Sequence, residues 1–212
     1  MTARRASLIL VRHGETEGES SIRYHGRNDV PLSELGRAQI RAARAAIEKN
    51  RAGGSFERVF TSPLVRAIES ARIIAATPPP IILEEFAEVH FGEFEGLTRA
   101  EIRARFPDEY ARWRSDPLSP AYTYPGGESR AAFATRVERG VVRMLSLWNL
   151  ESPRRAADAL VVAHRGVIRT IVQTLAGAAP EVELGSIQIL EYSGIWKPAA
   201  LDLVGHLDAV RE

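Results

Sequence analysis

The sequence predicts an α/β protein, a three-layer α/β/α sandwich with a largely parallel central sheet and a small helical insertion over the carboxyl end of that sheet. Two observations support this fold class. Short apolar runs alternate along the chain with longer segments of helical periodicity. Proline and glycine then interrupt this alternation in residues 97–128. The 212 residues, 45% of them hydrophobic, fit a single domain over residues 1–212.

Six short segments are expected to be strands, because apolar or β-branched residues dominate them and turn-forming residues bound them. They are residues 7–11, 58–61, 80–83, 159–163, 187–192 and 200–204. The segment 159–163 (Ala-Leu-Val-Val-Ala) has the continuous apolar pattern of a strand that is buried on both faces.

Five longer segments carry helical periodicity, and their starts contain capping signals. They are residues 33–50, 63–76, 98–114, 129–150 and 167–176. Ser33 is suited to cap the first of these helices. Thr98 and Glu101 have the spacing of a capping box. Ser62 is suited to cap a helix that begins at Pro63, since proline is favoured in the first turn.

The interruption at about residues 97–128 predicts a lid-like insertion. It carries aromatic residues, namely Phe106, Tyr110, Trp113, Tyr122 and Tyr124. These rings could hold an apolar or aromatic part of a ligand, or they could pack on one another. Both interpretations stay open from the sequence.

Composition excludes several classes of function. Lysine and arginine number 28 against 27 aspartate and glutamate, so the net charge of +1 does not favour a nucleic-acid partner. The absence of cysteine excludes disulfides, thiolate metal sites and a cysteine nucleophile. The apolar run before Arg12 is too short for a signal peptide, and no run approaches the roughly 18 residues of a membrane span. We therefore expect a soluble cytoplasmic protein with no membrane partner.

Arg12 and His13 directly follow the first predicted strand. Ligands of open α/β sheets bind beyond the carboxyl ends of the strands, so an imidazole there could meet an anion that the arginine holds. Arg66, in the first turn after the second strand, and His164, directly after the strand 159–163, belong to the same edge if these strands run parallel. Two histidines at equivalent strand ends can face each other.

Glu88 follows the third predicted strand and offers a carboxyl group for proton transfer. Four other glutamates lie close to it in the sequence, and composition does not choose among the five. A histidine after a strand, or an arginine in a first helical turn, is usually an ordinary surface or core residue. The spacing alone therefore indicates an α/β domain with a possible anion site.

Six segments, in order along nearly the whole chain, resemble the motifs of the histidine phosphatase superfamily, which has the phosphoglycerate mutase-like fold. They are residues 12–16 (Arg-His-Gly-Glu-Thr), 29–39, 61–67 (Thr-Ser-Pro-Leu-Val-Arg-Ala), 88–98, 125–129 (Pro-Gly-Gly-Glu-Ser) and 161–164 (Val-Val-Ala-His). One such segment would be a weak signal, whereas six in the right order make agreement by chance very improbable.

The resemblance implies a role for each motif residue. His13 would attack the phosphorus and become a phosphohistidine. Arg12, Arg66 and His164 would bind the phosphoryl oxygens. Glu88 would protonate the leaving alcohol and then activate water. This chemistry would need no metal and no cofactor.

The family contains phosphatases and mutases. Its mutases carry a longer insertion between the acid and the second histidine than the one between Glu88 and His164 here. We therefore expect a phosphomonoester hydrolase of the compact phosphatase branch that acts on a small phosphorylated metabolite, as a monomer or homodimer. The alternatives are a cofactor-dependent phosphoglycerate mutase and, in another class, a weakly active phospho-ligand-binding or interaction module.

Two positions depart from the family's pattern. Glu19 stands where many members have an asparagine that binds phosphate. It could turn away and leave the role to Ser20 or Ser21, pair with Arg23 or Arg27, or bind the substrate. Arg165 replaces the first of two glycines that usually follow the second histidine, and it could add a donor at the rim or pair with an acid. His25 and Gly26 match positions that line the leaving-group side in relatives.

Overall fold

The central sheet has six strands within the residues that the computed structural model describes, which are 6–51, 55–116, 119–149 and 158–210. The strand order is β4-β3-β6-β1-β7-β8. The strands are β1 (Ala6–Arg12), β3 (Arg58–Thr61), β4 (Ile81–Ile82), β6 (Ala159–Ala163), β7 (Ile187–Tyr192) and β8 (Trp196–Leu203). The first four strands of that order are parallel to one another. Strand β7 runs antiparallel to β1, and β8 runs antiparallel to β7. The largely parallel sheet is thus confirmed.

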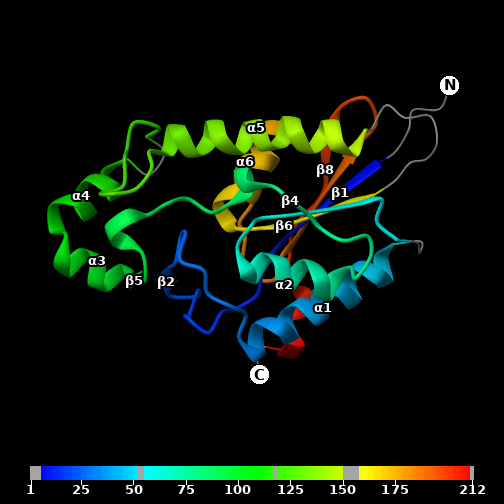
Figure 1. Ribbon diagram of the computed structural model, residues 1–212, viewed down its shortest axis with the longest axis horizontal. Helices are drawn as coiled ribbons and strands as arrows, with labels where there is room; N and C mark the ends of the chain where they lie inside the picture. The colour runs from blue at the N-terminus through cyan, green and yellow to red at the C-terminus, as the bar shows by residue number, and fades with distance from the viewer. Residues whose placement is uncertain (1–5, 52–54, 117–118, 150–157, 211–212) are drawn as a thin grey trace.

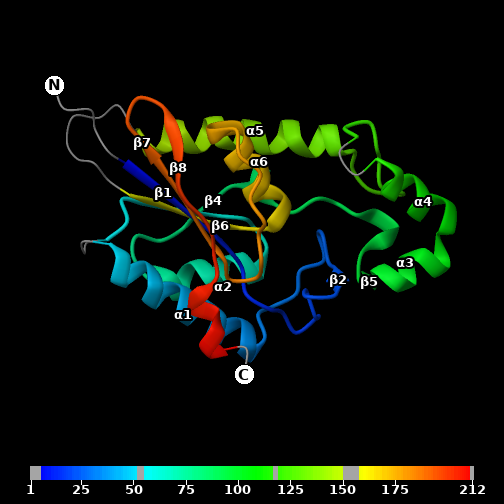
Figure 2. The same cartoon turned by 180° about the vertical axis from the view of Figure 1, so that it is seen from behind.

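Helices cover both faces of this sheet, which confirms the three-layer prediction (Figures 1 and 2). They are α1 (Glu34–Asn50), α2 (Val65–Ile74), α5 (Arg130–Trp148) and α6 (Arg165–Ala176). The alternation of β1 assigns the faces, since successive side chains of a strand point to opposite sides. Leu8 and Leu10 pack in one core with α5 and α6, whereas Ile9 and Val11 pack in the other with α1 and α2.

The insertion contains two helices rather than the one predicted over 98–114. These are α3 (Arg99–Arg105) and α4 (Pro107–Ser115), next to a two-stranded sheet of β2 (Arg23–Tyr24) and β5 (Leu97–Thr98). The single-helix prediction was wrong because Pro107 has no N–H to donate and disfavours helical geometry at Phe106, whose φ and ψ are −131° and 60°. The capping box of Thr98 and Glu101 is confirmed.

Some element boundaries also differ from the prediction. Helix α2 begins at Val65 rather than at Pro63, because Leu64 keeps an extended backbone, and the hydroxyl of Ser62 accepts a hydrogen bond from the Leu64 N–H. Helix α6 begins two residues earlier than expected, and β8 begins four residues earlier. The predicted end of the fourth helix, Leu150, lies outside the described residues. Ser33 caps α1 as expected, accepting from the Gly36 N–H.

Three short 3-10 helices complete the described structure, η1 (Glu84–Phe86), η2 (Gly92–Phe94) and η3 (Gly205–Val210). The connection between η1 and η2 carries Glu88 across the carboxyl end of the sheet. Among the helices described here, none has the length and apolarity that a bilayer crossing would require.

Candidate active site

The ends of three neighbouring strands are in register, and this alignment assembles the site. Arg12 on β1 pairs with Ala163 on β6, and the next N–H, that of His13, donates to the Ala163 carbonyl at 3.1 Å. On the other side of β6, the Ser62 N–H donates to the Val162 carbonyl at 3.2 Å. Parallel pairing therefore places His13, His164 and Ser62 at one edge of the sheet, as the sequence predicts for the two histidines.

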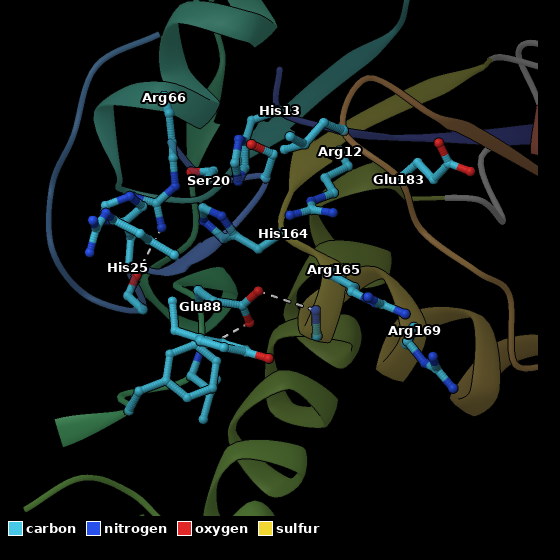
Figure 3. Close-up of a pocket in the computed structure, with 18 of the residues that line it drawn as sticks. Arg12, His13, Ser20, His25, Arg66, Glu88, His164, Arg165, Arg169 and Glu183 are labelled. Carbon is cyan, nitrogen blue, oxygen red and sulfur yellow. Dashed lines mark hydrogen bonds between the residues drawn. The ribbon is translucent and has the colours of Figure 1, made fainter. Parts of the chain in front are cut away.

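A pocket of about 1020 Å³ opens at this edge (Figure 3). It is lined by all five residues that the family motifs select: Arg12, His13, Arg66, Glu88 and His164. His25, Gly26 and Arg165 also line it, and so does Ser20. Glu19 is absent from the lining.

His13 is a neutral imidazole with one nitrogen available. Its side chain is 3% exposed, and Nδ1 lies 2.7 Å from the Gly14 carbonyl oxygen. A carbonyl only accepts, so Nδ1 carries the hydrogen and Nε2 keeps the lone pair. Burial, followed by the charges of Arg66 and Arg12, lowers the pKa of His13 well below its ordinary value. With no partner for Nε2 among the described residues, His13 has the form that a nucleophile requires.

His164 lies against His13, with ring centroids 5.1 Å apart and an angle of 62° between the ring planes. Its Nε2 is 2.7 Å from the hydroxyl oxygen of Ser62, and its Nδ1 is buried without a hydrogen-bond partner in the described structure. Burial is the main cause that lowers its pKa, with Arg66 next. Sequence reasoning gave Ser62 only a capping role. Its place directly after a strand of the same edge was the signal that could have shown this contact.

Two arginines, Arg66 buried and Arg12 half-buried, line the same pocket. Arg66 is 2% exposed and donates to the carbonyls of Gly26 and Asn28, each at 2.8 Å. Arg12 donates to the Val182 carbonyl at 2.8 Å, and burial lowers its pKa to about 10, so it stays charged at neutral pH. The Nε groups of both arginines are buried without a partner among the described residues. Two guanidinium groups that line one pocket favour an anion there.

Gly26 contributes through its backbone. Its φ of +52° is a left-handed conformation that glycine adopts without strain, and a Cβ there would lie 2.4 Å from the Glu95 carboxylate. This geometry turns the Gly26 carbonyl toward the guanidinium of Arg66. Gly26 therefore positions Arg66 at the edge of the pocket.

Glu88 is held by two backbone donors. Its Oε1 accepts from the Val89 N–H at 3.0 Å and its Oε2 accepts from the Gly166 N–H at 3.2 Å (Figure 3). A Cβ on Gly166 would lie 2.6 Å from the Glu88 carboxylate. The second of the two positions after His164 thus requires glycine, whereas the first admits Arg165.

Glu19, the first residue that departs from the family pattern, lies outside the pocket lining. Glu19 has a φ of +61°, its side chain is 61% exposed, and it forms an ion pair of 3.3 Å with Arg23. Ser20 turns into the pocket instead, with its hydroxyl 2.8 Å from that of Thr16. Two of the options for Glu19 therefore occur together. Glu19 pairs with Arg23, and Ser20 lies in the pocket lining.

Arg165 and His25 occupy two other parts of the lining. Arg165 is 50% exposed and pairs with Glu181 at 2.7 Å, so the guanidinium is at the rim and also has an acidic partner. His25 is buried, with Nε2 against the Gly18 carbonyl, and desolvation lowers its pKa.

The aromatic residues of the insertion pack on one another. Trp113 lies edge to face with Tyr110, with centroids 6.0 Å apart, and Tyr122 does so with Tyr124 at 5.1 Å. Trp113 and Tyr124 also line the pocket. Both interpretations of these rings thus have a structural basis. In the described part of the chain, no group of three or more His, Asp or Glu side chains is placed to hold a metal ion.

Comparisons with known proteins agree with this geometry. Residues 8–194 match the family model of the histidine phosphatase superfamily, branch 1. Over 195 residues the chain is 33% identical to a bifunctional protein of Mycobacterium tuberculosis, a match that covers 87% of this chain and 50% of that protein. The chain thus spans about half the length of this protein and of two further mycobacterial relatives that are matched over the same number of residues.

Two further relatives are matched over most of their length. The chain is 37% identical over 182 residues to a 2,3-bisphosphoglycerate-dependent phosphoglycerate mutase of Gloeobacter violaceus, covering 83% of this chain and 78% of that protein. It is 32% identical over 170 residues to the adenosylcobalamin/α-ribazole phosphatase of Salmonella typhimurium, covering 79% and 78%.

Among solved structures, the α-ribazole phosphatase of Shigella flexneri superposes with a TM-score of 0.78 at 25% identity, covering 92% of this chain and 96% of that one. The family match spans helices α1 to α6, the sheet apart from β8 and the first residues of β1, and every motif at the sheet edge. The chain belongs to branch 1 of the histidine phosphatase superfamily.

Proposed function

We propose that this protein is a phosphomonoester hydrolase that acts on a small phosphorylated metabolite through a phosphohistidine on His13. One observation supports this most. A neutral imidazole with an unpartnered Nε2 lines one pocket together with Arg12 and Arg66, whose positive charges both act on it. A phosphoryl group offers the electrophile that the imidazole needs and the acceptors that the arginines need.

The proposed first step is an in-line displacement. The Nε2 lone pair of His13 forms a bond to phosphorus while the bond from phosphorus to the ester oxygen breaks. Arg12, Arg66 and the Nδ1 side of His164 hold the equatorial oxygens, where charge spreads in the transition state. Glu88, in its protonated form, donates its proton to the departing alkoxide.

The second step returns the phosphoryl group to water. The Glu88 carboxylate takes a proton from a water molecule, the water oxygen bonds to phosphorus, and the bond between phosphorus and Nε2 breaks. Inorganic phosphate leaves, and His13 is neutral again. Because Arg12 and Arg66 supply the positive charge and His164 a further donor, the proposal includes no metal and no cofactor.

A phosphoglycerate mutase is the second candidate, and the 37% identity to such an enzyme favours it. The two activities differ in the second acceptor, a hydroxyl of the substrate instead of water. The family membership and the phosphatase relatives support the hydrolase. The cytoplasmic location and the monomeric or homodimeric state stay predictions from the sequence.

The test is hydrolysis of p-nitrophenyl phosphate and of a panel of cellular phosphate esters by the wild type and by His13→Ala. The wild type should turn over, and after an alkaline quench a phosphorylated peptide should contain His13. The variant should keep its circular dichroism spectrum and lose turnover. Retained turnover in a folded His13→Ala protein would contradict the mechanism.

Two controls separate the alternatives. Interconversion of 2- and 3-phosphoglycerate, primed with 2,3-bisphosphoglycerate, at a rate above hydrolysis would favour the mutase. Binding of phosphate esters without any turnover across the panel would favour a ligand-binding or interaction module. Glu19 was one reason to consider such a module, because it departs from the family's phosphate-binding pattern. That reason is weaker in the structure, because Glu19 lies outside the pocket lining.

A further inference from the structure

A pair of arginines extends the pocket beyond the residues of the proposed phosphoryl site. Arg165 and Arg169 both line the pocket and lie one turn apart on α6. Figure 3 shows them on the side of the pocket that is away from Arg66 and His25. Residues four apart share one helix face, so both guanidinium groups can reach one ligand.

Helix stability does not explain this pair. Arg165 is the first residue of α6, where the helix dipole disfavours a positive charge. Arg169 repeats the charge four residues later, and like charges at this spacing repel each other. Two unfavourable placements on the face toward the pocket suggest that the arginines serve a ligand.

The two side chains are available to bind one. The guanidinium of Arg169 has no hydrogen bond or ion pair with the described residues. Arg165 pairs with Glu181, but this pair is open to solvent, with the two side chains 50% and 73% exposed. An exposed ion pair holds its members weakly, so a second anion can share Arg165 at little cost.

The field of the pocket also favours a second negative charge. Seven arginines and three glutamates are among the lining residues. Two of those glutamates, Glu15 and Glu88, accept from backbone N–H groups. Burial is the main cause that lowers the pKa of Arg12, and the charge of Arg165 lowers it further, so the rim and the proposed phosphoryl site are close in electrostatic terms.

We propose that Arg165 and Arg169 form a second anion site, and that the preferred substrate is a phosphate ester whose leaving group carries a further phosphate or carboxylate. This inference rests on the proposed function, since the first phosphoryl group occupies the site of His13. The planar guanidinium matches both anions with paired hydrogen bonds. The pocket then selects substrates by the anion that does not react.

The experiment compares matched substrate pairs. 3-Phosphoglycerate and glycerol 3-phosphate differ in a carboxylate, and fructose 1,6-bisphosphate and fructose 6-phosphate differ in a phosphate. The preference is the ratio of kcat/KM for the two-anion ester to that for its one-anion partner. We expect a ratio of about 100 in at least one pair, which also identifies the anion, since each of the two arginines adds a charge-assisted hydrogen bond worth roughly a factor of ten.

Substitutions locate the site. Arg165→Gln and Arg169→Gln should each lower this ratio by about tenfold, and the double variant should bring it close to 1. Arg165→Lys should keep part of the preference, because it retains the charge without the planar fork. Arg114→Gln removes an equal charge from another part of the lining, on α4, and should change the ratio less than about twofold if the effect is local.

Arg143→Gln is the matched control outside the pocket. Arg143 is 54% exposed and pairs with Glu85 at 3.2 Å, much as Arg165 pairs with Glu181. It should change neither the activity nor the ratio. Two outcomes would overturn the second anion site. One is a preference ratio close to 1 for both substrate pairs in the wild type, and the other is an equal loss of the ratio in Arg114→Gln and Arg169→Gln.

Dissociation constants for the same four esters, measured by calorimetry on the His13→Ala protein, give a readout that does not depend on turnover. If no ester is hydrolysed, the proposed function fails. A binding preference that Arg169→Gln abolishes would still support the second anion site in that case. If hydrolysis occurs and neither rates nor binding distinguish the pairs, the second anion site alone is wrong.

Discussion

The imidazole rings of His13 and His164 lie edge to face, with their centroids 5.1 Å apart. They come from residues 151 positions apart in the chain (13 to 164), each directly after one of two adjacent parallel strands. Burial and the neighbouring arginines lower the pKa of both, so the rings are neutral and can lie in contact without mutual repulsion. Ser62, at the end of the next strand, contacts Nε2 of His164.

Glu88→Gln tests the acid. The substitution removes the transferable proton and keeps an oxygen that can accept from the Gly166 N–H. We expect kcat/KM for glycerol 3-phosphate to fall about 100- to 1000-fold, because an alkoxide leaves poorly without protonation. The loss for p-nitrophenyl phosphate should be much smaller, since its leaving group needs little protonation. Equal losses for both esters would indicate that Glu88 only supports the structure.

Ser20→Ala and Glu19→Ala form a matched pair of adjacent substitutions. Ser20 lines the pocket and Glu19 does not, so the first should lower kcat/KM for p-nitrophenyl phosphate by about tenfold through the loss of one hydrogen bond to the phosphoryl group. The second should change it less than about twofold. The reverse order would show that Glu19, rather than Ser20, contacts the substrate.

Phosphate and vanadate should stabilise the protein. Each anion would pair with the guanidinium groups of Arg12 and Arg66, which line the pocket, and offset the repulsion between the two cations. At about 100 times its dissociation constant, an anion contributes about 2.7 kcal/mol. For a chain of this size, that raises Tm by roughly 5 to 10 °C in a thermal melt. The rise should disappear in Arg66→Gln, and a rise of equal size in that variant would place the anion elsewhere.

Stability should fall with acidification below neutral pH. His13 and His164 have folded-state pKa values well below the unfolded value of 6.5, and the pKa of His25 is lowered too. Between the folded and unfolded pKa values only the unfolded chain binds these protons, so the free energy of unfolding rises with pH. Each fully shifted histidine adds up to about 1.4 kcal/mol per pH unit. Urea denaturation between about pH 5 and pH 7.5 measures this slope.

Replacement of the histidines provides the control for that slope. His164→Gln should flatten the dependence in the same pH window, because one titrating group is removed. A constant or falling stability from about pH 5 to pH 7 in the wild type would contradict the inferred protonation states.

The sequence by itself determined the sheet, the layers and the members of the pocket. Apolar runs such as residues 159–163 predict buried strands because a strand with helices on both faces has no polar side. Arg12, His13 and His164 follow directly from the ends of those strands, and Glu88 was selected by its motif. Sequence also located the insertion, but it missed the break between α3 and α4 at Phe106 and the short strand β5.

Tertiary structure decided what each side chain faces. The left-handed backbone at Glu19 directs its carboxylate toward Arg23 and leaves Ser20 to face the pocket, which a spacing rule cannot foresee. The contact between Ser62 and His164 joins residues 102 positions apart, and it forms because their strands pair in register. Local patterns follow from neighbours in the chain, whereas these contacts depend on how separate strands align in three dimensions.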